Sequence, residues 1–544
     1  MHSDEVYLDA FYGCQKRKGL ISMAKCPNIL MIIMDQHRPD LMGYGGNSVV
    51  RTPNLDLLAS QSMNFENAYV ANPICMPNRS TIFTGRMPSL HGSRYNGIPL
   101  DARAQTFPRA LKNAEYHTAH IGKCHLQNMG SSLEQLAKAL PNLPGQDARK
   151  DDLIDGWDRY ENMKRHEAEW VNMPDDYYGF SQVDLSVGHS DGCTGHYYHW
   201  AKAKGFDLAK MRGAKNAIEV SNPAVHVWRT SVPEEVYPTA YITERTQQYI
   251  ETHAAERADK PFFAVCSYPD PHHPFTPPGK YFDMFDPADM PLPETFNDAH
   301  ENSTPQYKRM LSKRGQPLRA HVNPFSPTEV EYREMAARAY GMIAMVDDGI
   351  GRVLSTLEQS GLAEDTIVIF TTDHGDMFGD HGMMLKGAMH YDGCIHVPLL
   401  IKAPGKKAGV SQSLVGSLDL AATALSIAGA ESYQGLQGHD LSPLLDNPFL
   451  KPRDSVLIEE DQVHDMVHVR KSLRMRTLVT DAARLTVYEG LVHGELYDRV
   501  NDPNEMWNLF GQPDGVALQA EMNTRLAQAM MSHADHSPRP TAFA

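Results

Sequence analysis

The sequence has few cysteines and no long apolar run. Its seven cysteines are an odd number, spread over 544 residues without a repeated spacing, which excludes a disulfide framework and a structural zinc site. No uninterrupted apolar stretch approaches the ~20 residues that a transmembrane helix needs. The first residues, from Met1 to Glu5, lack the basic and then apolar order of a signal peptide. We therefore expect a cytoplasmic protein that has no membrane partner.

The chain also lacks an excess of positive charge. Its 51 Lys and Arg residues against 67 Asp and Glu residues give a net charge of −16. Such a protein has no basic field to attract phosphates, which argues against a nucleic-acid partner. An anionic substrate would need a local positive pocket made by a metal ion, lysine and arginine. The hydrophobic share of 42% and the charged share of 22% are ordinary for a globular protein with a large core.

Four short apolar runs are each followed directly by polar, ionisable residues. These runs are residues 28–34, 117–121, 262–268 and 366–371. Each suits a buried parallel strand. In open α/β sheets, ligands bind beyond the carboxyl ends of the strands, so the four polar clusters should converge on one site.

Helical patterns separate these predicted strands. The clearest covers about residues 328–359, with Gly361 as a stop signal. The alternation predicts an α/β fold, with a large, mainly parallel sheet flanked by helices. Beyond it, short alternating runs predict a smaller C-terminal antiparallel sheet, followed by a helix. The runs are 455–459, 475–480, 485–488 and 495–497, and the helix covers about 515–532.

We predict three parts of the chain: an N-terminal extension over residues 1–23, a catalytic α/β domain over 24–454, and a C-terminal α+β subdomain over 455–544. Within the catalytic domain, residues 130–235 are loop-rich and dense in aromatic residues and histidine. We interpret that excursion as a cover of the sheet or a homo-oligomer contact, rather than as a wall of the substrate pocket. Residues 276–326 are rich in proline and predict extended surface loops.

The stretch around Cys75 is the least easily explained by packing. In the order Cys75-Met76-Pro77-Asn78-Arg79, the proline suits the first turn of a helix. Cys75 would then lie at the helix N-terminus, where unpaired amides favour negative charge. Arg79 would fall on the same helix face. A buried free cysteine in front of an ordinary helix is the alternative.

Asp35, Gln36, Asp373 and His374 are candidate metal ligands. Oxygen ligands that include two carboxylates suit Ca²⁺ or Mg²⁺, and one imidazole also admits Mn²⁺. Taken singly, an aspartate at a strand end usually caps a helix, and Asp373-His374-Gly375 could be a turn. Their joint occurrence at strand ends, together with Cys75, favours a metal site.

The pattern Cys-x-Pro-x-Arg resembles the signature of the sulfatase family, whose cysteine is oxidised to formylglycine by a maturation enzyme. Further family elements follow in order, from Thr52-Pro53-Asn54 to Leu496-Tyr497-Asp498, and the resemblance covers roughly residues 25–510. It implies an alkaline-phosphatase-like fold, and a sulfate monoester, expected to be an aryl sulfate, as the small-molecule substrate. It also implies one divalent metal ion, with Ca²⁺ first among the candidates, and a formylglycine-generating enzyme as a partner during maturation.

The resemblance further implies roles for the motif residues. Cys75, as the formylglycine hydrate, would attack sulfur and place one oxygen on the metal. Arg79 would hold the hydrate. The remaining metal ligands would be Asp35, Gln36, Asp373 and His374.

The other implied roles concern the ester itself. Lys123 and Lys386 would clamp its oxygens, and Asn96 would add a contact. His272 would protonate the leaving oxygen. His125 would take the proton from the second geminal hydroxyl, so that the covalent sulfate leaves by elimination.

Two departures from the family pattern leave alternatives open. Many sulfatases carry paired aspartates where this chain has Asp35-Gln36, and the glutamine form also resembles phosphonate monoester and phosphodiester hydrolases. That branch is expected to lack a Lys-x-His pair, which this chain keeps at Lys123 and His125, so we favour sulfate monoesters. His396 stands where relatives commonly carry arginine and receives no role. A third hypothesis is a non-catalytic binding protein whose motif cysteine stays a thiol.

Overall fold

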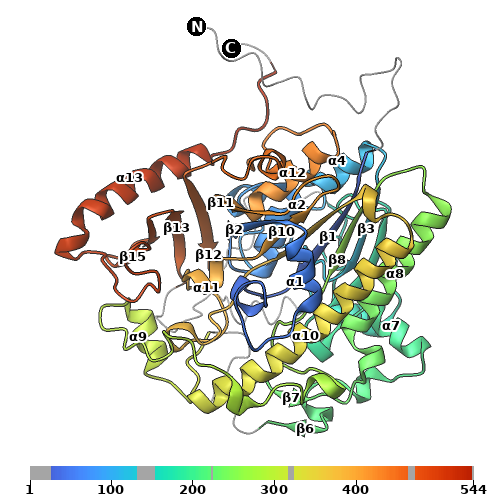
Figure 1. Cartoon of the computed structure of the whole chain (residues 1–544), viewed down its shortest axis with the longest axis horizontal. Helices are drawn as coiled ribbons and strands as arrows, with labels where there is room; N and C mark the ends of the chain where they lie inside the picture. The colour runs from blue at the N-terminus through green and yellow to red at the C-terminus, as the bar shows by residue number, and fades with distance from the viewer. Residues whose placement is uncertain (1–25, 131–152, 222–223, 317–323, 464–471, 542–544) are drawn as a thin grey trace.

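The computed structural model describes residues 26–130, 153–221, 224–316, 324–463 and 472–541 (Figure 1). The predicted N-terminal extension, residues 1–23, lies outside these ranges. No helix among the described residues has the length and apolar character to cross a membrane.

One nine-stranded sheet forms the centre of the protein, in the order β11-β2-β10-β9-β1-β8-β3-β4-β5. Its strands are β1 (Asn28–Met34), β2 (Met63–Tyr69), β3 (His117–Gly122), β4 (Gln182–Val187), β5 (Thr194–Gly195), β8 (Phe262–Ser267), β9 (Thr366–Thr372), β10 (Leu399–Lys402) and β11 (Gly409–Gly416). The neighbours β9, β1, β8, β3 and β4 are all parallel, whereas β10 is antiparallel to β9 and β2. The predicted mainly parallel sheet is confirmed, and β1, β3, β8 and β9 are the four apolar runs.

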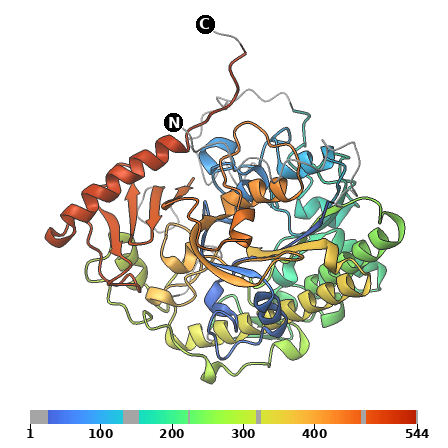
Figure 2. The same ribbon diagram turned by 45° about the horizontal axis from the view of Figure 1, so that its top comes forward.

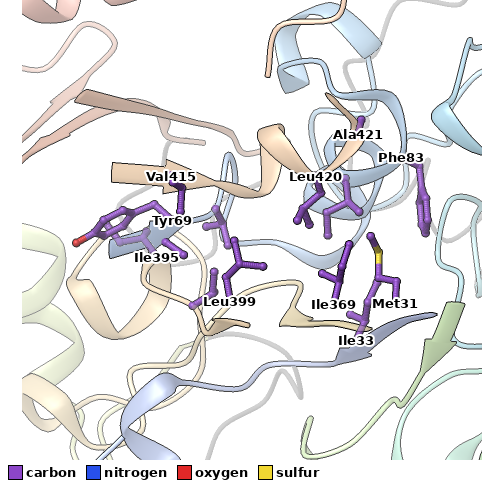
Figure 3. Packing of buried hydrophobic residues seen from close by; sticks show 14 of the residues in the cluster. Met31, Ile33, Tyr69, Phe83, Ile369, Ile395, Leu399, Val415, Leu420 and Ala421 are labelled. Carbon is purple, nitrogen blue, oxygen red and sulfur yellow. The ribbon is translucent and has the colours of Figure 1, made fainter. Parts of the chain in front are cut away.

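Helices cover both faces of this sheet, as the alternation predicts. They are α2 (Cys75–Thr84), α4 (Phe107–Asn113) and α12 (Leu420–Ile427) on one face, and α1 (Pro53–Ser60), α8 (Pro238–Glu256) and α10 (Glu329–Gln359) on the other (Figure 1). Because successive side chains of a strand point to opposite faces, Met31 packs in the first layer and Leu30 in the second. Figure 3 shows Met31 and Ile33 beneath Phe83 and Leu420.

The longest helix, α10, begins where the sequence predicts. The Thr328 side chain accepts from the amide of Glu331 at 3.3 Å, and the Glu331 carboxylate accepts from the amide of Thr328 at 2.7 Å, which satisfies two amides at the helix start. Further along, Asp347 accepts from the amides of Asn54 and Leu55 at 3.1 and 2.8 Å, and so caps α1 from a neighbouring helix.

A second, four-stranded antiparallel sheet follows in the chain. It is formed by β12 (Ser455–Asp461), β13 (Arg474–Thr480), β14 (Ala483–Tyr488) and β15 (Gly494–Asp498). Helix α13 (Val516–Ser532) packs on it through Met522 and Leu526 (Figure 2). These elements are the ones predicted for the C-terminal region; the division of the chain at residue 454 stays a prediction.

Two loop predictions need correction. In the described part of 130–235, β4 and β5 extend the main sheet, and α7 (His196–Ala203) packs beside them. In 276–326, a short helix α9 (Pro305–Leu311) forms, and Phe296 and Tyr307 are buried. Both segments bury aromatic side chains against the rest of the fold, a contact between distant parts of the chain that local composition does not reveal.

Arg484 connects the C-terminal sheet to the larger part of the protein. Its guanidinium is fully buried, and it donates to Glu495 at 3.1 Å and to Glu505 at 2.5 Å. The other oxygen of Glu505 accepts from the amide of Asp392, at 3.0 Å, next to the main sheet. Burial lowers the pKa of Arg484, but the two carboxylates outweigh it and hold the pKa above its ordinary value.

We expect Arg484→Met to lower the free energy of unfolding by about 3–5 kcal/mol, because it leaves two buried carboxylates without their partner. Urea unfolding followed by circular dichroism measures the loss. The control is Lys451→Met, which removes an exposed pair with Asp481 and should cost below about 1 kcal/mol. Equal losses in the two variants would contradict this structural role.

Candidate active site

The predicted site residues lie where the central parallel strands end. Asp35 follows β1, Lys123 follows β3, His272 lies beyond β8 and Asp373 follows β9. Cys75 opens α2, with its side chain 1% exposed. The parallel pairing brings the carboxyl ends of these strands to the same edge of the sheet. The prediction that the four polar clusters lie close together in space is therefore confirmed.

Asp35, Cys75, Asp373 and His374 form a buried cluster. Their ligand atoms all lie within 4.8 Å of one another. The Cys75 sulfur lies 3.0 Å from Nε2 of His374 and 3.9 Å from a carboxylate oxygen of Asp35. Burial lowers the pKa of His374, but Asp373 and Cys75 raise it above its ordinary value, so the field at this imidazole is negative. Two carboxylates and an imidazole in such a field fit a divalent cation.

Gln36 lies beside this cluster in a left-handed backbone conformation, with φ 61°. Its backbone amide donates to the Asp373 carboxylate at 3.1 Å. Its side-chain oxygen accepts from the ammonium of Lys386, and its side-chain nitrogen donates to Asp376. The side-chain oxygen is therefore the atom of Gln36 that can serve a metal ion.

Arg79 is fully buried and orders the acidic groups. It donates from Nε to Asp373 at 2.7 Å, and from Nη1 to the carbonyl of Lys123 at 2.7 Å and to Ser267 at 2.9 Å. Its Nη2 lies 3.7 Å from Asp35 and has no hydrogen-bond partner among the described residues. A direct contact of Arg79 with the nucleophile stays a prediction.

His189 and His272 also lie beside the Cys75 sulfur, with ligand atoms within 4.8 Å of it, and each contacts a lysine. Lys123 contacts Asp35 and lies 2.7 Å from Nε2 of His189. Lys386 contacts Nε2 of His272. The His189 and His272 rings stack with centroids 3.6 Å apart, at an interplanar angle of 17°. The two ammonium groups thus flank a pair of imidazoles that faces Cys75.

His125 and Asn96 complete the surroundings of Cys75. Glu161 accepts from the amide of His125 at 2.6 Å and holds it in a left-handed turn, with φ 57°. Burial and then Lys123 lower the pKa of His125 well below its ordinary value, so its imidazole is neutral. Asn96 accepts at 3.2 Å from the amide of Met76 in the first turn of α2.

A pocket of about 700 Å³ opens onto these groups. Cys75, Asn96, His125, His272 and Lys386 line it. The remainder of its wall comes partly from the segment predicted to cover the sheet: His189, Ala214, His226 and Trp228. That interpretation was wrong for these residues, which form a wall of the pocket.

A second hollow of about 690 Å³ lies beside Arg38, Asp380 and His396, and no predicted site residue lines it. His396 donates from Nδ1 to the Asp392 carboxylate at 3.0 Å, and its Nε2 lies 2.7 Å from the carbonyl oxygen of Glu66. These contacts explain its place in the fold, and we assign it no role in the chemistry.

His189 and Asp376 are the site residues that sequence reasoning missed. His189 follows β4, whose alternating Val183, Leu185 and Val187 would have indicated a strand with a polar end. Asp376 accepts from Gln36 and from the amides of Phe378 and Leu385, and so fixes the loop after the metal cluster. Its position three residues after Asp373 was visible in the sequence, but its partners were not.

Comparison with known proteins agrees with this geometry. The profile of the sulfatase family matches residues 27–430, and that of the C-terminal region of N-sulphoglucosamine sulphohydrolase matches residues 379–532. The chain is 28% identical over 518 residues to the uncharacterized sulfatase YidJ of Escherichia coli (strain K12). This alignment covers 94% of this chain and 88% of the relative. It is 28% identical over 496 residues to an arylsulfatase of Clostridium perfringens (strain 13 / Type A), covering 90% of this chain and 91% of the relative.

Among solved structures, the phosphonate monoester hydrolase of Agrobacterium radiobacter superposes with a TM-score of 0.74 at 24% identity, over 94% of this chain and 100% of that one. This likeness bears on the fold, which is the alkaline-phosphatase-like one that the sequence predicts. The family profile spans most of the chain, including Cys75, both lysines and every candidate metal ligand. The chain therefore belongs to the sulfatase family of sulfuric ester hydrolases.

Proposed function

We propose that this enzyme hydrolyses sulfate monoesters, aryl sulfates first among them, with Cys75 converted to formylglycine by a maturation enzyme. The observation that carries the proposal is the position of Cys75. It lies at the start of α2, 3.0 Å from His374 in the acidic cluster and in the same pocket wall as Lys386, His125 and His272. A nucleophile at this point would meet the ester between a cation site and two fixed ammonium groups.

Asp35, Gln36, Asp373 and His374 would hold one divalent cation, Ca²⁺ first among the candidates. Their oxygen-rich set and the negative field at His374 support this assignment. When bound, the ion lowers the pKa of a coordinated hydroxyl and neutralises the ester. Arg79 orients Asp373 through a hydrogen bond of 2.7 Å and places its positive charge 3.7 Å from Asp35.

In the first step, one geminal hydroxyl of the hydrated formylglycine would lose its proton to solvent and attack sulfur, and the bond from sulfur to the ester oxygen would break. Lys123 and Lys386 stabilise the negative charge that develops on the sulfuryl oxygens. His272 delivers the proton to the leaving oxygen. Its Nδ1 lies 2.5 Å from the carbonyl of His273, so Nδ1 carries a hydrogen, and Nε2 is the nitrogen that faces the substrate side.

The protonation of His272 must accompany substrate binding. Burial and then His189 and Lys386 lower the pKa of His272 well below its ordinary value, so the ring is neutral before substrate enters. A sulfate ester brings a negative charge next to Nε2 and draws Lys386 toward its own oxygens. Both effects raise the proton affinity of Nε2, and the ring can then act as a general acid.

In the second step, His125 removes the proton from the remaining geminal hydroxyl. The carbon–oxygen bond to the sulfate breaks, the aldehyde forms again and sulfate leaves; water then restores the hydrate. The neutral imidazole of His125 in the pocket wall suits a base. The Lys123–His125 pair supports this route over that of the phosphonate branch.

A phosphonate monoester or phosphodiester hydrolase is the second candidate, and Gln36 is the observation that favours it. The glutamine leaves the cation site with one carboxylate fewer than paired aspartates would give. The same nucleophile and clamp would serve both kinds of ester. A non-catalytic protein with a Cys75 thiol is the least favoured reading, because every matched position is chemically competent.

We expect Asp373→Asn to lose the bound metal and to lower turnover by at least about 100-fold, because it removes charge that offsets the cation and frees Arg79. Elemental analysis of the purified protein measures occupancy. Asp376→Asn is the control, since it leaves the candidate ligand set intact and should retain metal. Full occupancy and normal turnover in Asp373→Asn would rule out this metal site.

We expect His125→Ala to slow the second step more than the first on an aryl sulfate. Rapid mixing should then give a burst of phenol, of about one per active site, before slow turnover, because the sulfated intermediate accumulates. The preparation should carry formylglycine at position 75, checked by peptide mass spectrometry. A folded, metal-loaded variant without a burst and with unimpaired turnover would falsify the role of His125.

A further inference from the structure

The pocket beside Cys75 has a mostly apolar surface and contains no carboxylate among the described residues that line it. Its wall includes Ile74, Met76, Met129, Pro274 and Trp228, and Lys386 is the one charged side chain in this described lining. The chain carries 67 acidic residues, so their absence from this wall is a local feature. A cationic leaving group would find no counter-charge here.

Trp228 belongs to β7 (Trp228–Arg229), a short strand paired with β6 (Glu219–Val220). Its indole is partly buried, and its Nε1 donates to Asp191 at 2.9 Å. The same oxygen of Asp191 accepts from Thr230 at 2.8 Å and from the amide of Gly213 at 2.9 Å. One carboxylate oxygen therefore fixes the indole and two neighbouring points of the wall.

Asp191 is 1% exposed, and the two residues before it in the chain contact His272. Ser190, with φ 50°, donates to the carbonyl of His272 at 2.8 Å, and His189 stacks on the His272 ring. The three consecutive residues His189, Ser190 and Asp191 thus connect the wall to His272. This connection sets the distance between the indole and the group that faces the leaving oxygen.

We propose that Trp228 is the specificity-determining residue for the leaving group, that it selects uncharged aromatic alcohols, and that Asp191 is the residue that positions it. The proposal rests on the sulfatase function proposed above. An aromatic ring beside Trp228 buries its faces against an apolar wall, and an offset or edge-on ring contact adds to that burial. A charged or strongly hydrated leaving group would lose its water without gaining ionic partners.

The test compares a nitrophenyl sulfate with a small alkyl sulfate. In Trp228→Ala we expect kcat/KM for the aryl ester to fall about 3- to 10-fold, the range of one aromatic pair, chiefly through KM. The kcat/KM for the alkyl ester should change by less than about 2-fold, since this ester does not reach the indole. The control is Trp507→Ala, a half-exposed tryptophan outside the pocket lining, which should alter neither ester.

Asp191 is tested by two substitutions. The other Asp191 oxygen has no hydrogen-bond partner among the described residues, so Asp191→Asn can keep all three acceptor contacts with its amide oxygen. We expect Asn to retain the aryl preference and Asp191→Ala to lose it as Trp228→Ala does. If Asp191 had a purely structural role, Asp191→Ala would lower kcat/KM for both esters equally.

The outcomes separate the two proposals. If the mature wild-type enzyme turns over neither sulfate ester, the proposed function fails. Suppose that it turns over both esters. The specificity proposal is then overturned, and the proposed function stands, if Trp228→Ala lowers kcat/KM for both esters by the same factor. The same holds if Asp191→Asn loses the aryl preference as Asp191→Ala does. A selective loss on the aryl ester, rescued by Asn, supports the specificity proposal.

Discussion

The site depends on a balance of buried charge at the ends of four parallel strands. Asp35 and Asp373 are fully buried, and Arg79 and Lys123, also buried, lie against them. Breaking such a cluster by removing one member would leave an uncompensated charge in a low dielectric, which is strongly unfavourable. Asp373 itself keeps a pKa below its ordinary range, because Arg79 and His374 outweigh the effect of burial. This arrangement keeps Asp373 ionised and fixes both carboxylates beside Cys75.

The fold supplies the site from three directions. The strands β1, β3 and β9 deliver the acidic cluster and Lys123, and α2 presents Cys75 at its first turn. The segment after β4 then adds His189 and the wall that contains Trp228. The strand ends and α2 therefore supply the charged groups around Cys75, whereas the segment after β4 supplies part of the pocket wall.

The fold was largely predictable because its signals are local. The four apolar runs, the start of α10 at Thr328 and the C-terminal strands all lie where periodicity and capping place them. The site residues were predictable because their positions after parallel strands converge by topology, and because the Cys75 motif is specific. Their assignment to individual roles came from family resemblance, and the structure shows their proximity rather than their function.

The pocket wall could not be predicted, because it depends on contacts between distant residues. The bond between Asp191 and Trp228 joins positions 37 apart in sequence, and the stack of His189 on His272 joins two different strand ends. Neither leaves a periodic pattern. The turn at His125 is similar, since Glu161 holds its amide from a separate segment. Composition indicated an aromatic segment there but gave no information on what it faces.

We propose that the Lys123–His125 pair and the cation site together serve sulfate monoesters. The most direct test is a matched comparison of kcat/KM for an aryl sulfate, an aryl phosphonate monoester and a phosphodiester with the same leaving group, using enzyme that carries formylglycine at position 75. We expect the sulfate to be hydrolysed most efficiently, as this proposal requires. A phosphonate monoester or phosphodiester that clearly exceeds the sulfate would contradict it.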